Sequence, residues 1–330
     1  MKYDVISIGG ITEDIMFHTD DLQVLKNPQT GGANKLFAFE AGDKIVSDKE
    51  VVYTFGGGGG NSAVGFARLD LKVALVGALG ADPSSLKIIQ HFKKEGINVK
   101  GLQQIAHYWT GLSFVITAGQ GNDHVIFTHR AANDRFQLSI SNLLSFKTQW
   151  YYVTSLSGEF WQDNLQIIFD SAEKRKIKVA WNPGGIQLAK GYQWLKKYLR
   201  KCDVLILNKQ EAMELVSSFG KKVSKVPELL EILASLGPSI VSISDGPRGA
   251  YVYSQKQVYF KKALPFKAVN TTGAGDAFGS SLIGGLILYQ GDVEKSLHLA
   301  IIRSNFVVRK IGAQNGLLTL KEAKDLNYVQ

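Results

Sequence analysis

Short apolar runs alternate with longer amphipathic stretches along most of the chain. The apolar runs are almost continuous in Val, Ile and Leu, which is typical of strands buried on both faces of a parallel sheet. The predicted strands are residues 4–9, 72–80, 150–156, 178–183, 203–208, 239–244 and 250–254. Apolar residues recur with helical spacing between several of them, at residues 61–69, 82–96, 164–176, 209–219 and 226–237. This order predicts an α/β fold in which helices cover both faces of a mostly parallel sheet.

Two regions break this alternation. Residues 18–55 contain no good helix and look like strands joined by Gly and Asp turns, and residues 111–130 alternate on both sides of "AGQGND" as a hairpin would. We predict a single domain, residues 1–330, in which segments 15–55 and 107–133 leave the main sheet and build a small β lid. Ordinary edge strands of the main sheet are the alternative.

Composition narrows the class of protein. With 330 residues, 45% of them hydrophobic and 20% charged, the chain can bury a large core. The net charge of +9 is spread along the chain, and its densest basic clusters, residues 174–178 and 196–201, fall where predicted helices end. Solvated helix faces explain these clusters better than a nucleic-acid groove, so no nucleic-acid partner is expected. A net positive charge also permits an anionic substrate such as a nucleoside triphosphate.

Cysteine usage and the chain's start indicate a compartment. The single cysteine, Cys202, excludes an internal disulfide, fits a reducing compartment and adjoins a predicted strand as a buried thiol would. The chain opens on a predicted strand instead of a charged and then apolar leader. Its most apolar late segment, residues 280–289, is too short and too rich in glycine to span a bilayer. We therefore expect a cytoplasmic protein without a membrane partner.

The stretch "VNTTGAGDAFGSSLIGGLILY" (269–289) carries the strongest chemical pattern. Gly273, Ala274 and Gly275 stand where an extended segment enters a helix, so consecutive backbone N–H groups at a helix N-terminus are available to an anion. Asp276 follows directly, and a carboxylate beside a bound phosphate suits proton abstraction from an attacking hydroxyl. The structural alternative is that Asp276 only helps to cap the helix.

A run of five glycines, residues 56–60, lies between two apolar segments. It could be a slack linker, a tight turn or a backbone surface that another group approaches closely. No glycine cluster has the Lys and Ser/Thr of a Walker loop, and Asn61 stands where the dinucleotide fingerprint needs its third glycine. Hydride transfer on a dinucleotide-binding domain is therefore the weaker interpretation.

Four ordered motifs resemble the ribokinase (PfkB) family of carbohydrate and nucleoside kinases. "NTTGAGDAF" (270–278) is similar to its C-terminal signature, and "GGGGGNSAVGFARL" (56–69) resembles its N-terminal signature, in which glycines precede an Asn that opens a helix. "NKQE" (208–211) looks like the family's N-x-x-E motif, and "SDGPRGAYVY" (244–253) looks like its nucleotide-binding turn. The resemblance implies a ribokinase-like three-layer α/β/α fold with a β lid, and ATP-dependent phosphorylation of a primary hydroxyl on a sugar-like molecule.

The resemblance also implies catalytic and metal roles. Asp276 would be the general base, and the amides of Gly273, Ala274 and Gly275 would form an anion hole for the transferring phosphoryl group. Asn208 and Glu211 would organise Mg²⁺ around the triphosphate, Glu211 through water. From the residues alone, Asn208 and Glu211 are equally the N-cap and third residue of a helix.

For the nucleotide, the resemblance implies a pocket around adenine and ribose shaped by Ser244, Gly246 and Gly249. The segment 310–316, which includes Gly312, would close its other side. A plain turn explains "DGPRG" almost as well when it is considered alone.

For the acceptor, the resemblance implies that Asp14 and Asn61 hold substrate hydroxyls above a floor made by Gly57 and Gly58. Buried polyol hydroxyls need such matched partners. The stretch Ala131-Ala132-Asn133 resembles a variant of the Gly-Ala-Asn stretch that ends one part of the family's lid.

Two departures from the family's usual residues and two rival functions stay open. Asn270 stands where the family's signature usually has Asp, in a region that binds a monovalent cation in several members, so K⁺ activation is uncertain. Gly58 stands where ribokinase proper has Lys, which weakens a strict ribokinase assignment. The rivals are a nucleoside kinase of the same fold and a sensor that binds nucleotide and sugar without turnover. The resemblance also implies a homodimer formed through the lids.

Overall fold

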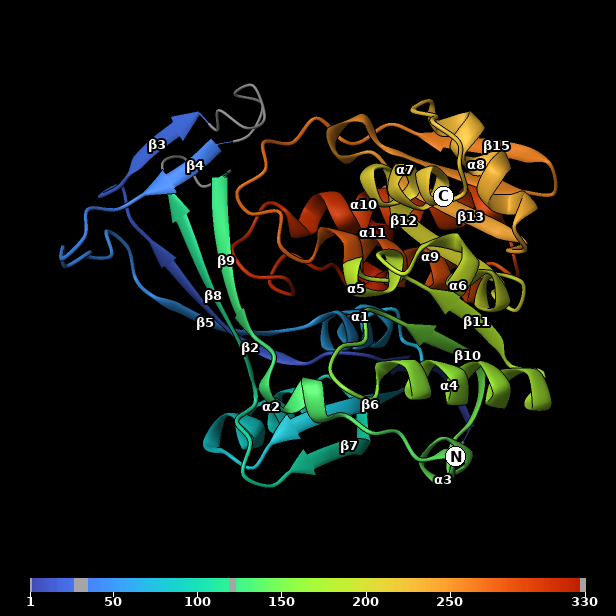
Figure 1. Ribbon diagram of the computed structural model, residues 1–330, viewed down its shortest axis with the longest axis horizontal. Helices are drawn as coiled ribbons and strands as arrows, with labels where there is room; N and C mark the ends of the chain where they lie inside the picture. The colour runs from blue at the N-terminus through green and yellow to red at the C-terminus, as the bar shows by residue number, and fades with distance from the viewer. Residues whose placement is uncertain (1, 27–34, 119–122, 327–330) are drawn as a thin grey trace.

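A nine-stranded sheet forms the centre of the molecule (Figure 1). The computed structural model describes residues 2–26, 35–118 and 123–326. Strands from β7 to β13 in spatial order run parallel, while β14 and β15 are antiparallel additions at one edge. The spatial order is β15 (Gln257–Lys261), β14 (Ala250–Ser254), β13 (Ile240–Ser244), β12 (Val204–Asn208), β11 (Lys178–Trp181), β10 (Lys147–Val153), β1 (Lys2–Ile8), β6 (Val73–Gly80) and β7 (Asn98–Ile105).

Helices cover both faces of this sheet, which makes three layers. One face carries α3 (Ile140–Leu144), α4 (Trp161–Arg175), α5 (Gly185–Leu188), α6 (Gly191–Leu199), α7 (Lys209–Ser218) and α8 (Val226–Ser235). The other carries α1 (Gly58–Ala67), α2 (Pro83–Lys94), α9 (Ala274–Leu288) and α10 (Val293–Val307). The short α11 (Leu320–Asp325) packs outside this second layer, against Leu69 and Leu299. The predicted α/β/α fold with a mostly parallel sheet is confirmed.

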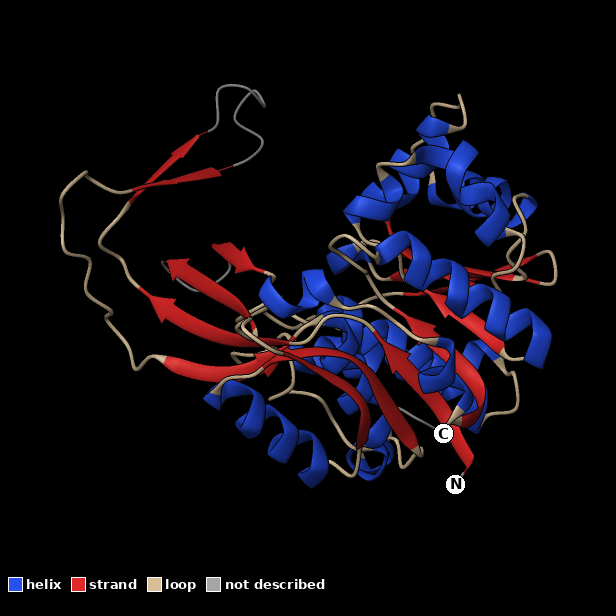
Figure 2. Cartoon of the chain, turned by 60° about the horizontal axis from the view of Figure 1, so that its bottom comes forward, coloured by secondary structure: helices blue, strands red, loops and turns tan. Residues whose placement is uncertain are grey.

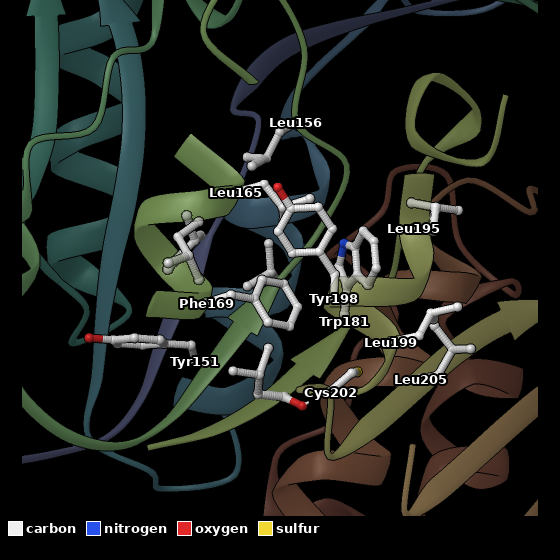
Figure 3. Packing of buried hydrophobic residues seen from close by; sticks show 14 of the residues in the cluster. Tyr151, Leu156, Leu165, Phe169, Trp181, Leu195, Tyr198, Leu199, Cys202 and Leu205 are labelled. Atoms are coloured by element: carbon white, nitrogen blue, oxygen red, sulfur yellow. Dashed lines mark hydrogen bonds between the residues drawn. The ribbon is translucent and has the colours of Figure 1, made fainter. Parts of the chain in front are cut away.

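Each central strand contributes to two separate cores. In β10, Tyr151 and Val153 point into one core, whereas Trp150 and Tyr152 point into the other. This follows from the two-residue period of a strand. Figure 3 shows the first core, where Phe169 of α4 packs edge-on against Trp181 of β11 with ring centroids 5.6 Å apart. Burial on both faces explains why these strands read as continuous apolar runs.

A second, four-stranded sheet leaves the main sheet, as Figures 1 and 2 show. Its order is β5 (Val52–Gly56), β2 (Thr12–His18), β8 (Gly111–Ala118) and β9 (Asp123–His129), and a separate hairpin pairs β3 (Gln23–Lys26) with β4 (Lys35–Ala38). The predicted excursions from the main sheet are therefore confirmed, and the edge-strand alternative is wrong. The predicted hairpin tip around 119–122 and residues 27–34 lie outside the described residues. That this sheet acts as a lid stays a prediction.

The structure differs from the expected elements at several places. Strands β7 and β15 and helix α10 were not expected from the hydrophobic pattern. Helix α1 begins at Gly58, so the expectation that Asn61 opens it is wrong by almost one turn. Glycine is a poor helix former, and here packing overrides that preference. In the described parts of the chain, no helix combines the length and apolarity needed to cross a membrane.

Candidate active site

The glycine run packs the start of α1 directly onto the link between β1 and β2. The Gly59 amide donates a hydrogen bond to the Gly10 carbonyl at 3.0 Å, and a Cβ on Gly59 would lie 2.8 Å from the Gly9 backbone. A Cβ on Gly58 would lie 3.0 Å from the Thr154 side chain. Backbone therefore contacts backbone along this run, so it is neither a slack linker nor a simple turn. Gly57 and Gly58 remain partly exposed on its outer side.

The two glycine-rich motifs meet through one hydrogen bond. Asn61 Nδ2 donates to Asp276 Oδ2 at 2.8 Å, although the two residues are 215 positions apart in the chain. Asn61 lies in the first turns of α1, and Asp276 lies in the first turn of α9, whose N-cap is Gly273 with a left-handed φ of 79°. Asn61 and Asp276, assigned from the sequence to acceptor binding and base catalysis, are thus direct neighbours.

The surroundings of Asp276 make its carboxyl unusually basic. Burial raises its pKa to about 6, and the nearby negative charge of Asp14 acts in the same direction. The hydrogen bond from Asn61 opposes both effects because it favours the charged form. A carboxyl with a pKa near neutrality is ionised in most molecules at pH 7 and still holds a proton well, which suits a general base.

Asp14 lies in β2, with its carboxyl among hydroxyl groups of the second sheet. Its side chain is 4% exposed, Thr12 Oγ1 donates to its Oδ1 at 2.7 Å, and burial raises its pKa. Its neighbours across the strands are Thr54 in β5 and Ser113 in β8. The Thr54 hydroxyl is buried and has no partner among the described residues. The arrangement offers acceptors and donors to a ligand that carries several hydroxyl groups.

The first turn of α9 presents free amides. The N–H groups of Gly275 and Asp276 have no hydrogen-bond partner among the described residues, whereas Ala274 N donates to Thr271 O at 3.2 Å. Unpaired amides at the positive end of a fifteen-residue helix favour a bound anion. Of the amides predicted to form the anion hole, that of Ala274 is engaged in a turn.

A cavity of about 400 Å³ adjoins this helix start. Its lining joins Gly275 and Ala274 to Ser244, Gly246 and Gly249, so the structure brings the predicted anion hole and the predicted nucleotide turn together. The rest of the wall is largely apolar and includes Ala263, Leu264, Phe266, Phe278, Ile301 and Val308. Such a wall suits a flat heterocycle.

Other predicted nucleotide residues lie around this cavity or apart from it. A neighbouring hollow is lined by Asn208 and again by Ser244 and Gly246, which continues the cavity toward α7. Gly312 does not line either of these hollows. A Cβ there would lie 3.0 Å from Thr54 of β5, so Gly312 faces the second sheet instead.

Asn208 and Glu211 form a reciprocal cap on α7. Asn208 N donates to Glu211 Oε2 at 2.8 Å, and Glu211 N donates to Asn208 Oδ1 at 2.9 Å. The capping alternative is therefore realised. Only one carboxylate oxygen of Glu211 is used by this cap, and a hard oxygen ligand fits Mg²⁺ or one of its waters. Capping and metal binding are thus compatible at Glu211.

The side chain of Asn270 is a poor ligand for a monovalent cation. Its Oδ1 accepts the Thr272 N–H at 3.1 Å, and its buried Nδ2 group has no partner among the described residues. An amide nitrogen donates hydrogen bonds and does not coordinate a cation. The residue present therefore fits K⁺ poorly.

Two residues near the Asn61–Asp276 pair are not among the site residues predicted from the sequence. The Tyr152 phenol lies against α9, where a Cβ on Gly279 would come within 2.1 Å of it, and Gln314 Nε2 donates to Asn61 Oδ1 at 3.0 Å. Burial raises the pKa of Tyr152, and the charge of Asp276 adds to the effect. Tyr152 reads only as a core strand residue, and Gln314 has no spacing that ties it to another motif.

Comparison with known proteins decides the family. The model of the pfkB family carbohydrate kinases matches residues 26–320. The chain belongs to this family. It is a kinase that transfers phosphate to an alcohol group, and the family and enzyme class predicted from the four motifs are confirmed.

Individual pfkB relatives resemble this chain over almost its whole length. A ribokinase of Lactococcus lactis subsp. lactis is 27% identical over 318 residues, which cover 96% of this chain and 94% of the relative. The structure of Arabidopsis thaliana ribokinase complexed with ribose and ATP matches with a TM-score of 0.80 and 19% identity, covering 100% and 99% of the two chains. An adenosine kinase from Sinorhizobium meliloti matches with a TM-score of 0.78 and 18% identity, covering 99% and 100%. These two structures show the fold, and the protein is a sugar or nucleoside kinase of this family.

Proposed function

We propose that this kinase phosphorylates a primary hydroxyl of a sugar-like molecule with ATP, and that Asp276 is its general base. The observation that carries the proposal is the position of Asp276. Asp276 is the residue after Gly275, which lines the apolar cavity. Its carboxyl has a pKa of about 6, accepts a hydrogen bond from Asn61 and lies near the negative charge of Asp14. Nucleotide-binding and hydroxyl-binding groups therefore converge on one basic carboxylate.

The chemistry assigned to this site is an in-line transfer. Asp14 and Asn61 hold the acceptor, and Asp276 takes the proton from its hydroxyl while the new O–P bond forms at the γ-phosphorus. The bond to the β-phosphate oxygen breaks, and ADP leaves. The free amides of Gly275 and Asp276 face the charge on the transferring group. Glu211 would hold Mg²⁺ through water, and the ion would neutralise charge on the triphosphate.

The second sheet is proposed to close over the acceptor. It carries Asp14 and Thr54, so its approach to α9 would complete the hydroxyl-binding groups and exclude water from the reaction. A water-free site would suppress hydrolysis of ATP without an acceptor.

A sugar is favoured over a nucleoside by the side chains of the predicted lid. Trp109 is 69% exposed, and Phe39 is also exposed, so neither lines a preformed apolar slot for a base. Phe114 packs on Phe17, with ring centroids 5.7 Å apart. Around Asp14, by contrast, the neighbours are hydroxyl groups, which match a polyol better than an aromatic ring.

A substrate panel tests the proposal. Pentoses, hexoses, sugar phosphates and nucleosides would each be mixed with ATP and Mg²⁺, and ADP release measured in buffers with K⁺ and with tetramethylammonium. We expect turnover with a sugar or sugar phosphate and, because of Asn270, equal rates in the two buffers. Preference for a nucleoside would support the nucleoside kinase instead. Absence of ADP release with every acceptor would contradict catalysis and support the sensor.

We also propose that two copies pair through their second sheets. Exposed apolar residues occur on this part of the molecule, on β9 and on the β3–β4 hairpin: Val125, Ile126, Phe127, Val24, Leu25 and Leu36. Successive side chains of a strand point to opposite faces, so Val125 and Phe127 share one face of β9, and we assign that face to contact with a second copy.

Sedimentation velocity tests the dimer. The unchanged protein should sediment as a dimer at micromolar concentration, and Phe127→Lys, at a side chain 56% exposed, should shift it to monomer. Leu144→Lys is the matched control, because Leu144 is 53% exposed on α3, on the body of the molecule. A monomeric parent protein, or equal effects of the two variants, would refute the pairing.

A further inference from the structure

Three consecutive hydrogen bonds connect Asp276 to His91, on a helix that the proposed chemistry does not use. Asn61 Nδ2 donates to Asp276 Oδ2 at 2.8 Å, Gln314 Nε2 donates to Asn61 Oδ1 at 3.0 Å, and His91 Nε2 lies 2.7 Å from Gln314 Oε1. The four residues come from α9, α1, the segment after α10 and α2. None of these three hydrogen bonds joins residues that are close together in the chain.

All the N–H groups of this series point toward the carboxylate. The amide oxygen of Gln314 can only accept, so His91 Nε2 must carry a hydrogen and donate it. Gln314 then donates to Asn61, and Asn61 donates to Asp276. If the Asn61 amide were turned over, its oxygen would face the Asp276 carboxylate and its NH₂ group would face that of Gln314, so two hydrogen bonds would be lost.

The far end of the series is firmly held. Asn61 and Gln314 are each only 5% exposed. The Gln314 carbonyl accepts from Arg68 Nη1 at 2.7 Å, and the same guanidinium holds Glu95 through Nε and Nη2 at 3.0 and 2.6 Å. The His91 ring packs against Phe55 at 5.1 Å between centroids. Gln314 is therefore fixed through both its backbone and its side chain.

We propose that Gln314 and His91 are positioning residues, which hold the Asn61 amide in the one orientation that donates to Asp276. This inference rests on the proposed role of Asp276 as base. Other ionisable groups near Asp276 are Asp14 of β2 and Tyr152 of β10, and those near His91 are Arg68 and Glu95. Among the described residues, neither Arg68 nor Glu95 bonds to Asn61 or Asp276, so Gln314 sets the direction of the Asn61 amide.

Loss of this orientation should change how Asp276 titrates as well as how fast the enzyme works. With Asn61 free to turn, its NH₂ group would donate to the carboxylate for only part of the time. The ionised form would lose stabilisation, so its pKa would rise and the acid limb of the kcat/KM profile would move to higher pH. A residue that only filled space would leave this limb unmoved.

The test compares pH profiles of three variants. Gln314→Met keeps the volume and removes both hydrogen bonds, and we expect about a tenfold fall in kcat at pH 7 and an acid limb shifted upward by about half a pH unit. His91→Phe keeps a ring and removes the donor, so a smaller shift in the same direction is expected even if Gln314→Met folds poorly. Gln103→Met is the matched control, since it makes the same substitution at a side chain that donates to the Gln137 carbonyl on edge strand β7, and it should give the parent profile.

The outcomes separate this inference from the proposed function. If Asp276→Asn abolishes turnover while Gln314→Met and His91→Phe keep the parent acid limb, positioning by Gln314 and His91 is refuted and the base assignment stands. If Asp276→Asn turns over at a near-normal rate, the base assignment fails and the positioning role falls with it. Upward shifts in both variants, with the parent profile in Gln103→Met, would support the inference.

Discussion

Replacement of Asp276 by Asn is expected to lower kcat by about 10²–10⁴, the usual contribution of a positioned general base, while ATP and acceptor still bind. The amide is nearly the same size as the carboxyl, and its oxygen can still accept the hydrogen bond that Asn61 donates at 2.8 Å. Only the capacity to take a proton is lost. Steady-state kinetics together with calorimetric titration of ATP would separate loss of turnover from loss of binding.

The same carboxyl should govern the pH dependence of the parent enzyme. Its carboxylate is the active form, so kcat/KM should fall as the pH drops through about 6. Asp276→Asn has no such group, and its residual rate should be flat across this range. An acid limb near pH 4 in the parent, or turnover of the variant within a factor of three, would contradict the role of Asp276 as base.

The pH dependence of folding stability provides a control for the Asp276→Asn variant, because the sign of the expected change is known. Because the folded pKa of Asp276 is raised from 3.8 to about 6, the folded protein binds more protons than the unfolded chain between these values. Its stability therefore falls as the pH rises from about 4 to 6, by up to about 3 kcal/mol from this group. Asp276→Asn avoids this loss, so the variant should unfold at a higher temperature than the parent at pH 8, with the gap closing below pH 4. A variant that is inactive and more stable cannot owe its inactivity to unfolding.

The fold and the residues of the candidate site could be predicted from local patterns for a physical reason. A parallel strand buried on both faces must be apolar throughout, and an anion site at a helix N-terminus needs small residues followed by the start of a helix. Both requirements are met within a few consecutive residues, as at 203–208 and 273–276. Short stretches thus predicted the α/β fold and an anion site beside a carboxylate, and the carbohydrate-kinase class followed from their resemblance to the ribokinase (PfkB) motifs.

What could not be predicted depends on contacts between distant segments. Strand β7, "NVKGLQQI", is polar at half of its positions and is held in the main sheet by pairing with β6. Helix α1 starts three residues early because its glycines fit against Gly9 and Gly10, which no helix propensity would indicate. The partners of Asn61 likewise come from positions 276 and 314, and nothing in the chain ties those positions together before it folds.

Gly57 should be the least replaceable residue of the glycine run. Its φ of 81° belongs to a conformation that side chains disfavour, and a Cβ there would lie 2.4 Å from the Gly10 carbonyl oxygen and 2.7 Å from the Ile11 Cα. These obstacles are backbone atoms, so they cannot move aside by changing a rotamer. The conformational strain of about 1–2 kcal/mol and an overpacking cost of about 1–3 kcal/mol therefore add.

We expect Gly57→Ala to lower the free energy of unfolding by about 2–5 kcal/mol, against about 1–2 kcal/mol for Gly96→Ala. Gly96 is the matched control because its φ of 76° is similar and a Cβ there would meet no atom within 4 Å. Urea unfolding of both variants measures the difference, and equal losses would show that conformation alone, without close packing, requires glycine at 57. Any Gly57→Ala protein that folds should also turn over slowly. A displaced α1 would carry Asn61 away from Asp276, and a shift of about 1 Å is enough to cost roughly a hundredfold in rate.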